Sequence, residues 1–150
     1  MPPRRIARFH VSLKLILRDT QGRMLLLKAL ENSSMKGFHD LPGGRITWEE
    51  RDLPLVTIMT REIREELGTR VRFRMQQTTP VAVSLHEYYS KRYRRVRYAL
   101  WVFFEARYLG GPVVISSEHT GYLWTRINKK NLRHYFTGGA LAGMQNYYSH

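Results

Sequence analysis

The chain begins with the pattern of two β-strands joined by a turn. Residues 9–17 alternate between apolar and polar positions and then become continuously apolar, and residues 23–28 form a second run with β character. Thr20–Gly22 lies between the two runs and consists of turn formers. This pattern predicts a β-hairpin.

The next segment predicts a loop and a bend. Residues 31–37 are loop formers, and Phe38–Gly44 ends in Pro-Gly-Gly, which breaks both helices and strands. We therefore expect a tight, exposed bend at this point of the chain.

A helical period follows the bend. Apolar residues recur every four positions at Leu55, Met59, Ile63 and Leu67. Asp52 is expected to cap the helix, the first turn tolerates Pro54, and Gly68 marks the end.

The rest of the chain has mainly strand character. Aromatic and β-branched residues predict strands, which are expected at residues 71–75, 81–88, 96–108 and 122–127. Residues 128–136 predict a helical stretch, and the glycine-rich tail predicts a frayed last helix. This order of elements indicates the α/β class, with helices packed on a mixed β-sheet.

Length and composition narrow the class of protein. A chain of 150 residues fits a single domain, here residues 1–150 with a short basic tail at 1–7. The absence of cysteine excludes disulfides, zinc–thiolate sites and thiol nucleophiles. No apolar run is long enough to span a bilayer and no targeting segment is visible, so we expect a cytoplasmic protein without a membrane partner.

The charge balance favours an anionic partner. The chain has 25 Lys and Arg against 12 Asp and Glu, which gives a net charge of +13. Such a charge attracts polyphosphates or nucleic acid, although it also serves solubility alone. The strongest basic run, residues 91–97, lies where a hairpin tip is expected. It is either a binding site for polyphosphate or RNA, or a charged turn that keeps the sheet edge soluble.

The acidic residues are concentrated in one segment. Half of the 12 carboxylates lie within residues 49–66. Glu62, Glu65 and Glu66 are spaced i, i+3 and i+4, so they project from one side of the predicted helix. Oxygen ligands on one ridge suit Mg²⁺ bound together with substrate phosphates. The alternative is a solvated helix face in which Arg61 pairs with Glu65.

The segment from Gly44 to Gly68 resembles the Nudix box, G-x5-E-x7-R-E-U-x-E-E-x-G-U, where U is a bulky aliphatic residue. Residues 61–68 match its second half at every fixed position, and Leu41–Gly44 is similar to the LPGG bend before the box. Three extra residues separate Glu50 from Arg61, which leaves the role of Glu50 open. Thr69 replaces the last aliphatic residue.

This resemblance, with a weaker one at Ser117–Trp124, implies the Nudix α/β/α sandwich. It also implies hydrolysis of a diphosphate linkage in a nucleoside diphosphate-linked substrate, with Mg²⁺ as the cofactor and Mn²⁺ as a possible substitute. By resemblance, Glu62 is a metal ligand or the general base, Glu65 and Glu66 are ligands, the Gly44 carbonyl is a further ligand, and Arg61 holds a neighbouring carboxylate.

The same resemblance implies roles for further residues. Glu118 in a later loop is the principal rival to Glu62 as the base, and Glu87 is a more distant one. Arg45 and Lys28 occupy positions where the family often places cations that touch phosphate, although both are equally interpretable as surface charges. The aromatic residues and histidines receive no role.

Two alternatives to this function stay open. The net charge and residues 91–97 favour an RNA 5′-pyrophosphohydrolase, whereas loss of turnover would leave a nucleotide-sensing or binding module. The isomerase branch of the fold needs a catalytic cysteine, and this chain has none. The expected partner is a nucleotide-type small molecule, with RNA as the alternative, and the chain is expected to be a monomer or a homodimer.

Overall fold

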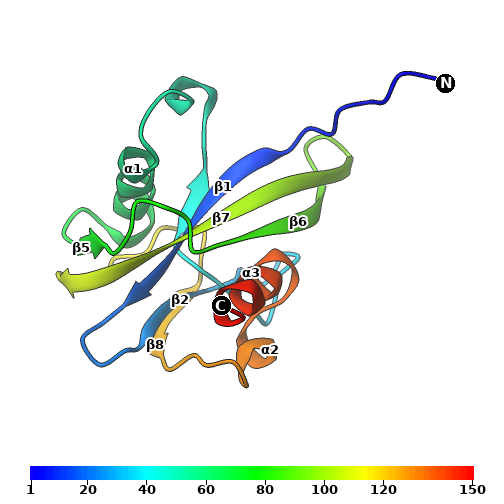
Figure 1. Ribbon diagram of the computed structural model, residues 1–150. Helices are drawn as coiled ribbons and strands as arrows, with labels where there is room; N and C mark the ends of the chain where they lie inside the picture. Colours follow the sequence, from blue (N-terminus) through cyan, green and yellow to red (C-terminus); the bar gives the residue numbers. More distant parts are fainter.

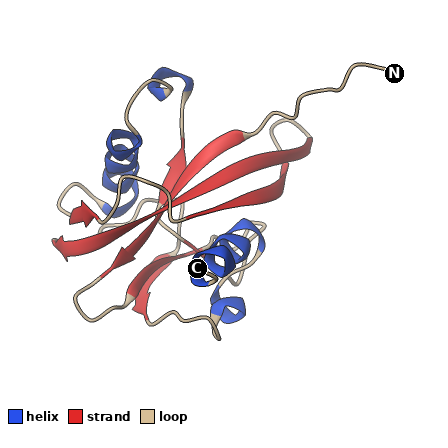
Figure 2. Cartoon of the chain, viewed as in Figure 1, coloured by secondary structure: helices blue, strands red, loops and turns tan.

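A mixed sheet separates α1 from α2 and α3 in the computed structural model, which describes residues 1–150 (Figures 1 and 2). The strands are β1 (His10–Arg18), β2 (Met24–Lys28), β3 (His39–Asp40), β4 (Gly43–Arg45), β5 (Arg72–Met75), β6 (Ala82–Ser90), β7 (Arg95–Gly110) and β8 (Gly121–Thr125). The helices are a single 3₁₀ turn (Trp48–Glu50), α1 (Leu55–Leu67), α2 (Leu132–Tyr135) and α3 (Gly138–Tyr148). None of them is long and apolar enough to cross a lipid bilayer. The predicted fold class is confirmed.

β1 is the centre of the sheet. It pairs in parallel with β7 along its whole length, from His10 opposite Ala99 to Arg18 opposite Arg107. On its other side it pairs with β4 and, at one residue next to the hairpin turn, with β2. The predicted hairpin is therefore present, but β2 diverges at once to pair with β8 and β3. This divergence lets the glycine-rich segment enter the sheet beside β1.

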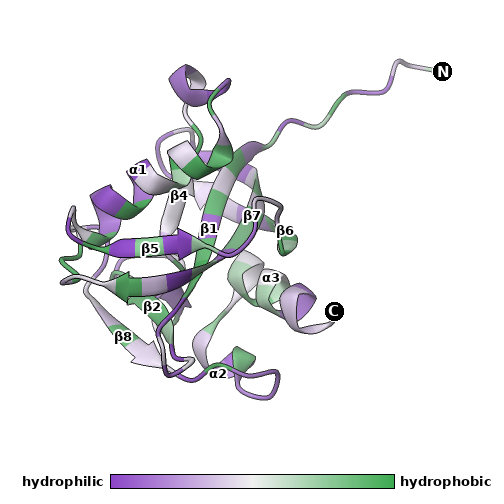
Figure 3. Cartoon of the chain, turned by 60° about the vertical axis from the view of Figure 1, so that its left-hand side comes forward, coloured by the Kyte–Doolittle hydropathy of each residue, from purple (hydrophilic) through white to green (hydrophobic).

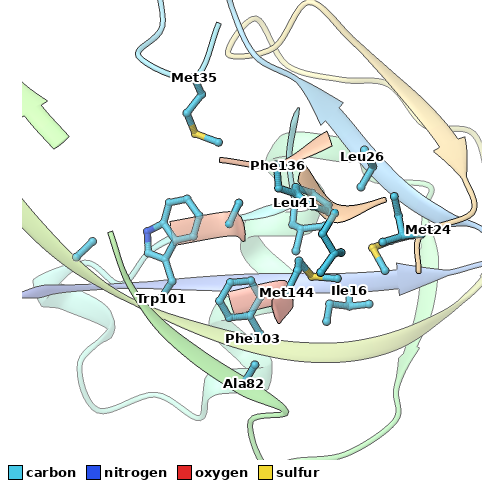
Figure 4. Packing of buried hydrophobic residues seen from close by; sticks show 14 residues of the cluster. Ile16, Met24, Leu26, Met35, Leu41, Ala82, Trp101, Phe103, Phe136 and Met144 are labelled. Atoms are coloured by element: carbon cyan, nitrogen blue, oxygen red, sulfur yellow. The ribbon is translucent and has the colours of Figure 1, made fainter. Parts of the chain in front are cut away.

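Alternation along β1 assigns each side chain to one face. Leu13, Leu15 and Leu17 pack under α1, together with the buried face of that helix. Ile16 faces the opposite way, into the apolar cluster that also contains Phe103 and Met144 (Figure 4). α1 carries both hydrophilic and hydrophobic residues along its length, whereas α3 is mostly apolar or neutral (Figure 3). Each helix thus covers its own face of the sheet.

Three local predictions about the helices need correction. Asp52 does not cap α1, because the residue before the helix is Pro54 and no side chain bonds to the free N–H groups there. The last helix is not frayed. It is 11 residues long and packs on β6, and Gly143 touches the ring of Phe103 so closely that any side chain would overlap it. The glycines of α3 allow close approach to the sheet. The helical stretch predicted at residues 128–136 is reduced to the single turn of α2.

Candidate active site

A cavity of about 620 Å³ opens beside β1 and β4. Its walls come from β1, β4, α1, β6, β7 and the loop between β7 and β8, so segments distant in sequence meet there. The predicted site residues that line it are Gly44, Arg45, Arg61, Glu62, Glu65, Glu66 and Glu118. Lys28 does not line it. Its side chain lies at the end of β2 beside Gly121, and its contact with phosphate stays a prediction.

The bend before the cavity is buried, not exposed as predicted. Gly43 has φ 145° and lies against the main chain of β1, where any side chain would overlap the Leu13 carbonyl group. Pro42 accepts a hydrogen bond from the Leu15 N–H at 2.8 Å. Gly44 in turn touches the Glu62 carboxylate so closely that a methyl group would overlap it. The two glycines therefore bring the bend against both β1 and α1.

Arg61 organises the acidic side chains. It donates to both carboxylate oxygens of Glu50, at 2.5 and 2.6 Å, to Glu62 at 2.6 Å and to Glu65 at 3.0 Å. Glu50 is buried and also accepts from the Thr47 main chain and hydroxyl. The three additional residues lie between Glu50 and Arg61, after the 3₁₀ turn, and Glu50 still reaches Arg61. Its bonds to Arg61 hold the pKa of Glu50 below its ordinary value.

Loss of this pair is expected to lower stability. Arg61→Met leaves the buried Glu50 carboxylate without its bidentate partner and should reduce the free energy of unfolding by about 1–3 kcal/mol. Chemical denaturation of the metal-free protein measures the change. Glu50→Gln in the Arg61→Met background should restore part of the loss, since it removes the unpaired charge. An Arg61→Met protein as stable as the wild type would contradict this role.

Glu66 is, with Glu62, a buried acid of the site. Its Oε2 accepts a hydrogen bond from the Gly43 N–H at 2.9 Å, which joins α1 to the bend. The pKa of Glu66 is raised to about 8. Burial is the largest cause, and the charges of Asp40 and Glu118 also raise the pKa, while Lys14 and the Gly43 N–H lower it. Burial also raises the pKa of Glu62, against the effect of Arg61. Glu62 is thus paired with Arg61, whereas Glu66 forms no ion pair and is short of compensating positive charge.

The later loop brings Glu118 to the same cavity. The Val114 and Ser116 N–H groups donate to the carbonyls of Leu67 and Glu66, which anchors the β7–β8 loop to the end of α1. Glu118 is consequently among the residues that line the cavity. Glu87 lies on the outer face of β6 and does not line the cavity.

The donor set is suited to a hard divalent cation. Carboxylates of Glu62, Glu65 and Glu66 and the Gly44 carbonyl supply oxygen ligands only. As the side chains stand, no three acidic or imidazole groups converge on one point, because Arg61 holds Glu62 and Glu65. The raised pKa of Glu66 indicates that added positive charge beside it would be favourable.

Several cavity residues received no role from the sequence. Lys14 is buried and forms an ion pair with Asp40 at 2.9 Å, with its ammonium group 4.3 Å from the centre of the Trp101 ring. His86 stacks on the same ring at 4.3 Å between centroids, and burial lowers the pKa of His86. The polar residues Ser12 and Lys14 inside an apolar strand were the one available signal. The partners of Lys14 come from distant segments, so the sequence gave no signal for them.

Comparison with known proteins identifies the family. The family model described as NUDIX domain matches residues 8–137. The chain belongs to the Nudix family. Members of this family generally hydrolyse nucleoside diphosphates linked to another group, so the prediction of a Nudix pyrophosphohydrolase is confirmed at the level of the family. No curated protein matches the chain.

Solved structures show the same fold at low identity. A MutT protein from Methanosarcina mazei Go1 is 23% identical, with a TM-score of 0.67, over 94% of this chain and 91% of that one. An ADP-ribose pyrophosphatase from Streptococcus suis 89-1591 is 18% identical, with a TM-score of 0.60, over 93% and 90%. The NUDIX domain of Shewanella oneidensis NrtR, determined with ADP ribose, is 13% identical, with a TM-score of 0.62, over 95% and 87%.

Proposed function

We propose that this Nudix hydrolase cleaves a diphosphate linkage in a nucleoside diphosphate-linked substrate and uses Mg²⁺, with Mn²⁺ as a substitute. The observation that carries the proposal is the position of Glu66. This carboxyl group is buried at the wall of the cavity, is bonded to the Gly43 N–H and has Glu62 and Glu65 on the same helix face. An oxygen-lined cavity in which Glu66 has no ion-pair partner suits a cation that carries phosphate.

Each protein group has a definite task in this proposal. Glu62, Glu65, Glu66 and the Gly44 carbonyl would hold the metal, which when bound supplies charge neutralisation for the diphosphate and a more acidic water. Arg61 keeps Glu62 and Glu65 on the cavity side of α1 through its hydrogen bonds. Arg45 at the cavity rim supplies a cation for substrate phosphate.

Glu62 and Glu118 are the two candidates for the general base. Glu62 is held by Arg61, whereas Glu118 is exposed and free to approach a water in the cavity. We compare kcat of Glu62→Gln and Glu118→Gln at saturating Mg²⁺, where the larger loss identifies the base, with an expected size of about 10²–10⁴-fold. Glu87→Gln is the matched control, because Glu87 lies outside the cavity. If neither cavity variant loses rate, this mechanism is wrong.

A substrate panel tests the function itself. Nucleoside triphosphates, dinucleoside polyphosphates, nucleotide sugars, ADP-ribose, dinucleotide cofactors and capped RNA are incubated with and without Mg²⁺, and released phosphate or nucleotide is measured. Turnover that requires a divalent cation is the expected result. Inactivity across the whole panel, combined with measurable nucleotide binding, would instead support a sensing or binding module.

A further inference from the structure

The N-terminal tail and the start of β7 form a second hollow, which we call the tail groove. Its volume is about 940 Å³. Its charged wall consists of five arginines, Arg4, Arg5, Arg8, Arg95 and Arg97, and Tyr98 is its aromatic member. Figure 1 shows the tail leaving the sheet on the side where the β6–β7 hairpin ends.

No protein group neutralises these arginines. No acidic residue occurs before Asp19, and none lies between Glu87 and Glu105. None of the five arginines takes part in an ion pair of the structure. Like charges packed this closely repel one another, so binding of a polyanion would relieve the repulsion.

Aromatic rings accompany the positive charge. Phe9 packs edge-on against Tyr98, with 6.0 Å between ring centres, and this contact holds the tail beside β7. At the hairpin tip, Tyr93 is half exposed and lies between Arg92 at 5.4 Å and Arg97 at 4.5 Å. Exposed aromatic rings among arginines are typical of surfaces that bind single-stranded nucleic acid, because bases stack on the rings while the cations follow the phosphates.

The tail groove continues from the cavity. Arg97 on β7 lies opposite Tyr88 on β6, and Tyr88 lines the cavity. The Tyr88 hydroxyl is 3.0 Å from His10 Nε2, and the Arg45 guanidinium lies 5.6 Å from the centre of the Tyr88 ring. His10 and Arg45 also line the cavity. A nucleic-acid strand whose end occupies the cavity therefore passes Arg97 and reaches the tail groove next.

We propose that the tail groove binds the phosphate backbone of a single-stranded nucleic acid whose 5′ polyphosphate end lies in the cavity. The inference rests on the proposed function for the identity of the reacting end only. A single nucleotide in the cavity has no phosphate that extends along the tail, whereas an oligonucleotide has one at each residue.

Binding is tested without catalysis, with a labelled 12-nucleotide RNA that carries a 5′ hydroxyl and so has no diphosphate to cleave. The groove variant combines Arg5→Gln, Arg8→Gln and Arg95→Gln. The matched control combines Arg70→Gln, Arg72→Gln and Arg74→Gln, which removes three exposed arginines at the opposite end of β7. We expect the groove variant to bind about tenfold more weakly at moderate salt, with a salt slope lower by about 2. Equal losses in the two variants would overturn the proposal.

Two further measurements separate the outcomes. Tyr93→Leu should weaken RNA binding about tenfold and leave binding of inorganic polyphosphate unchanged, and equal effects on both ligands would overturn the assignment to nucleic acid. The ratio of kcat/KM for 5′-triphosphorylated RNA to kcat/KM for a free nucleotide should fall about tenfold in the groove variant. RNA binding without any hydrolysis would refute the proposed function alone, whereas hydrolysis with an unchanged ratio would refute the tail groove alone.

Discussion

Glu65→Gln and Glu66→Gln are each expected to lower turnover at least about a hundredfold while the fold stays intact. Both substitutions keep the size of the side chain and one acceptor oxygen, replace the other oxygen with a donating NH2 group and remove the negative charge. Glu66 Oε2 accepts from the Gly43 N–H, and a glutamine oxygen accepts the same bond. The loss should therefore come from weaker binding of the divalent cation and its phosphate.

The measurement is a Mg²⁺ titration of kcat with circular dichroism of each variant. Glu49→Gln is the matched control, because Glu49 is exposed and lies outside the cavity. The two variants should require more Mg²⁺ for half-maximal rate, whereas the control should not. Unaltered rates in both Glu65→Gln and Glu66→Gln would remove the metal-site assignment.

Glu66→Gln is also expected to be more stable than the wild type at high pH in the absence of metal. The folded protein raises the pKa of Glu66 from 4.5 to about 8, so between these values the folded state retains a proton that the unfolded chain has released. Stability then falls as pH rises through this window, by on the order of 5 kcal/mol when the group is fully ionised. The glutamine side chain of the variant does not ionise, so its free energy of unfolding does not fall for this reason.

The difference between the two proteins at each pH is the quantity to measure. Burial lowers the pKa of His10, His39, His86 and His119, and these groups make stability rise with pH near neutrality. They act equally in wild type and variant, so they cancel in the difference. Chemical denaturation should give near-equal stabilities at pH 4.5 and a more stable variant above pH 8. Addition of Mg²⁺ at pH 8 should stabilise the wild type more than the variant. A constant difference across pH would contradict the environment assigned to Glu66.

Most elements of the fold followed from local patterns. The period of four at Met59, Ile63 and Leu67 predicted the buried face of α1, and Gly68 marked its end. Predictions failed where a distant segment decides the conformation. The bend at Gly43 is buried because β2 diverges from β1, and α3 is ordered because Gly139 and Gly143 allow it to approach β6 and β7.

The candidate site divides in the same way. The sequence by itself determined that Glu62, Glu65 and Glu66 share one side of a helix, since the rotation per residue of an α-helix is a local property. Only the tertiary structure decided that Glu50 reaches Arg61 across three additional residues and that the β7–β8 loop brings Glu118 to the cavity. These contacts depend on strand pairing and register between segments far apart in the chain, which no spacing along the sequence encodes.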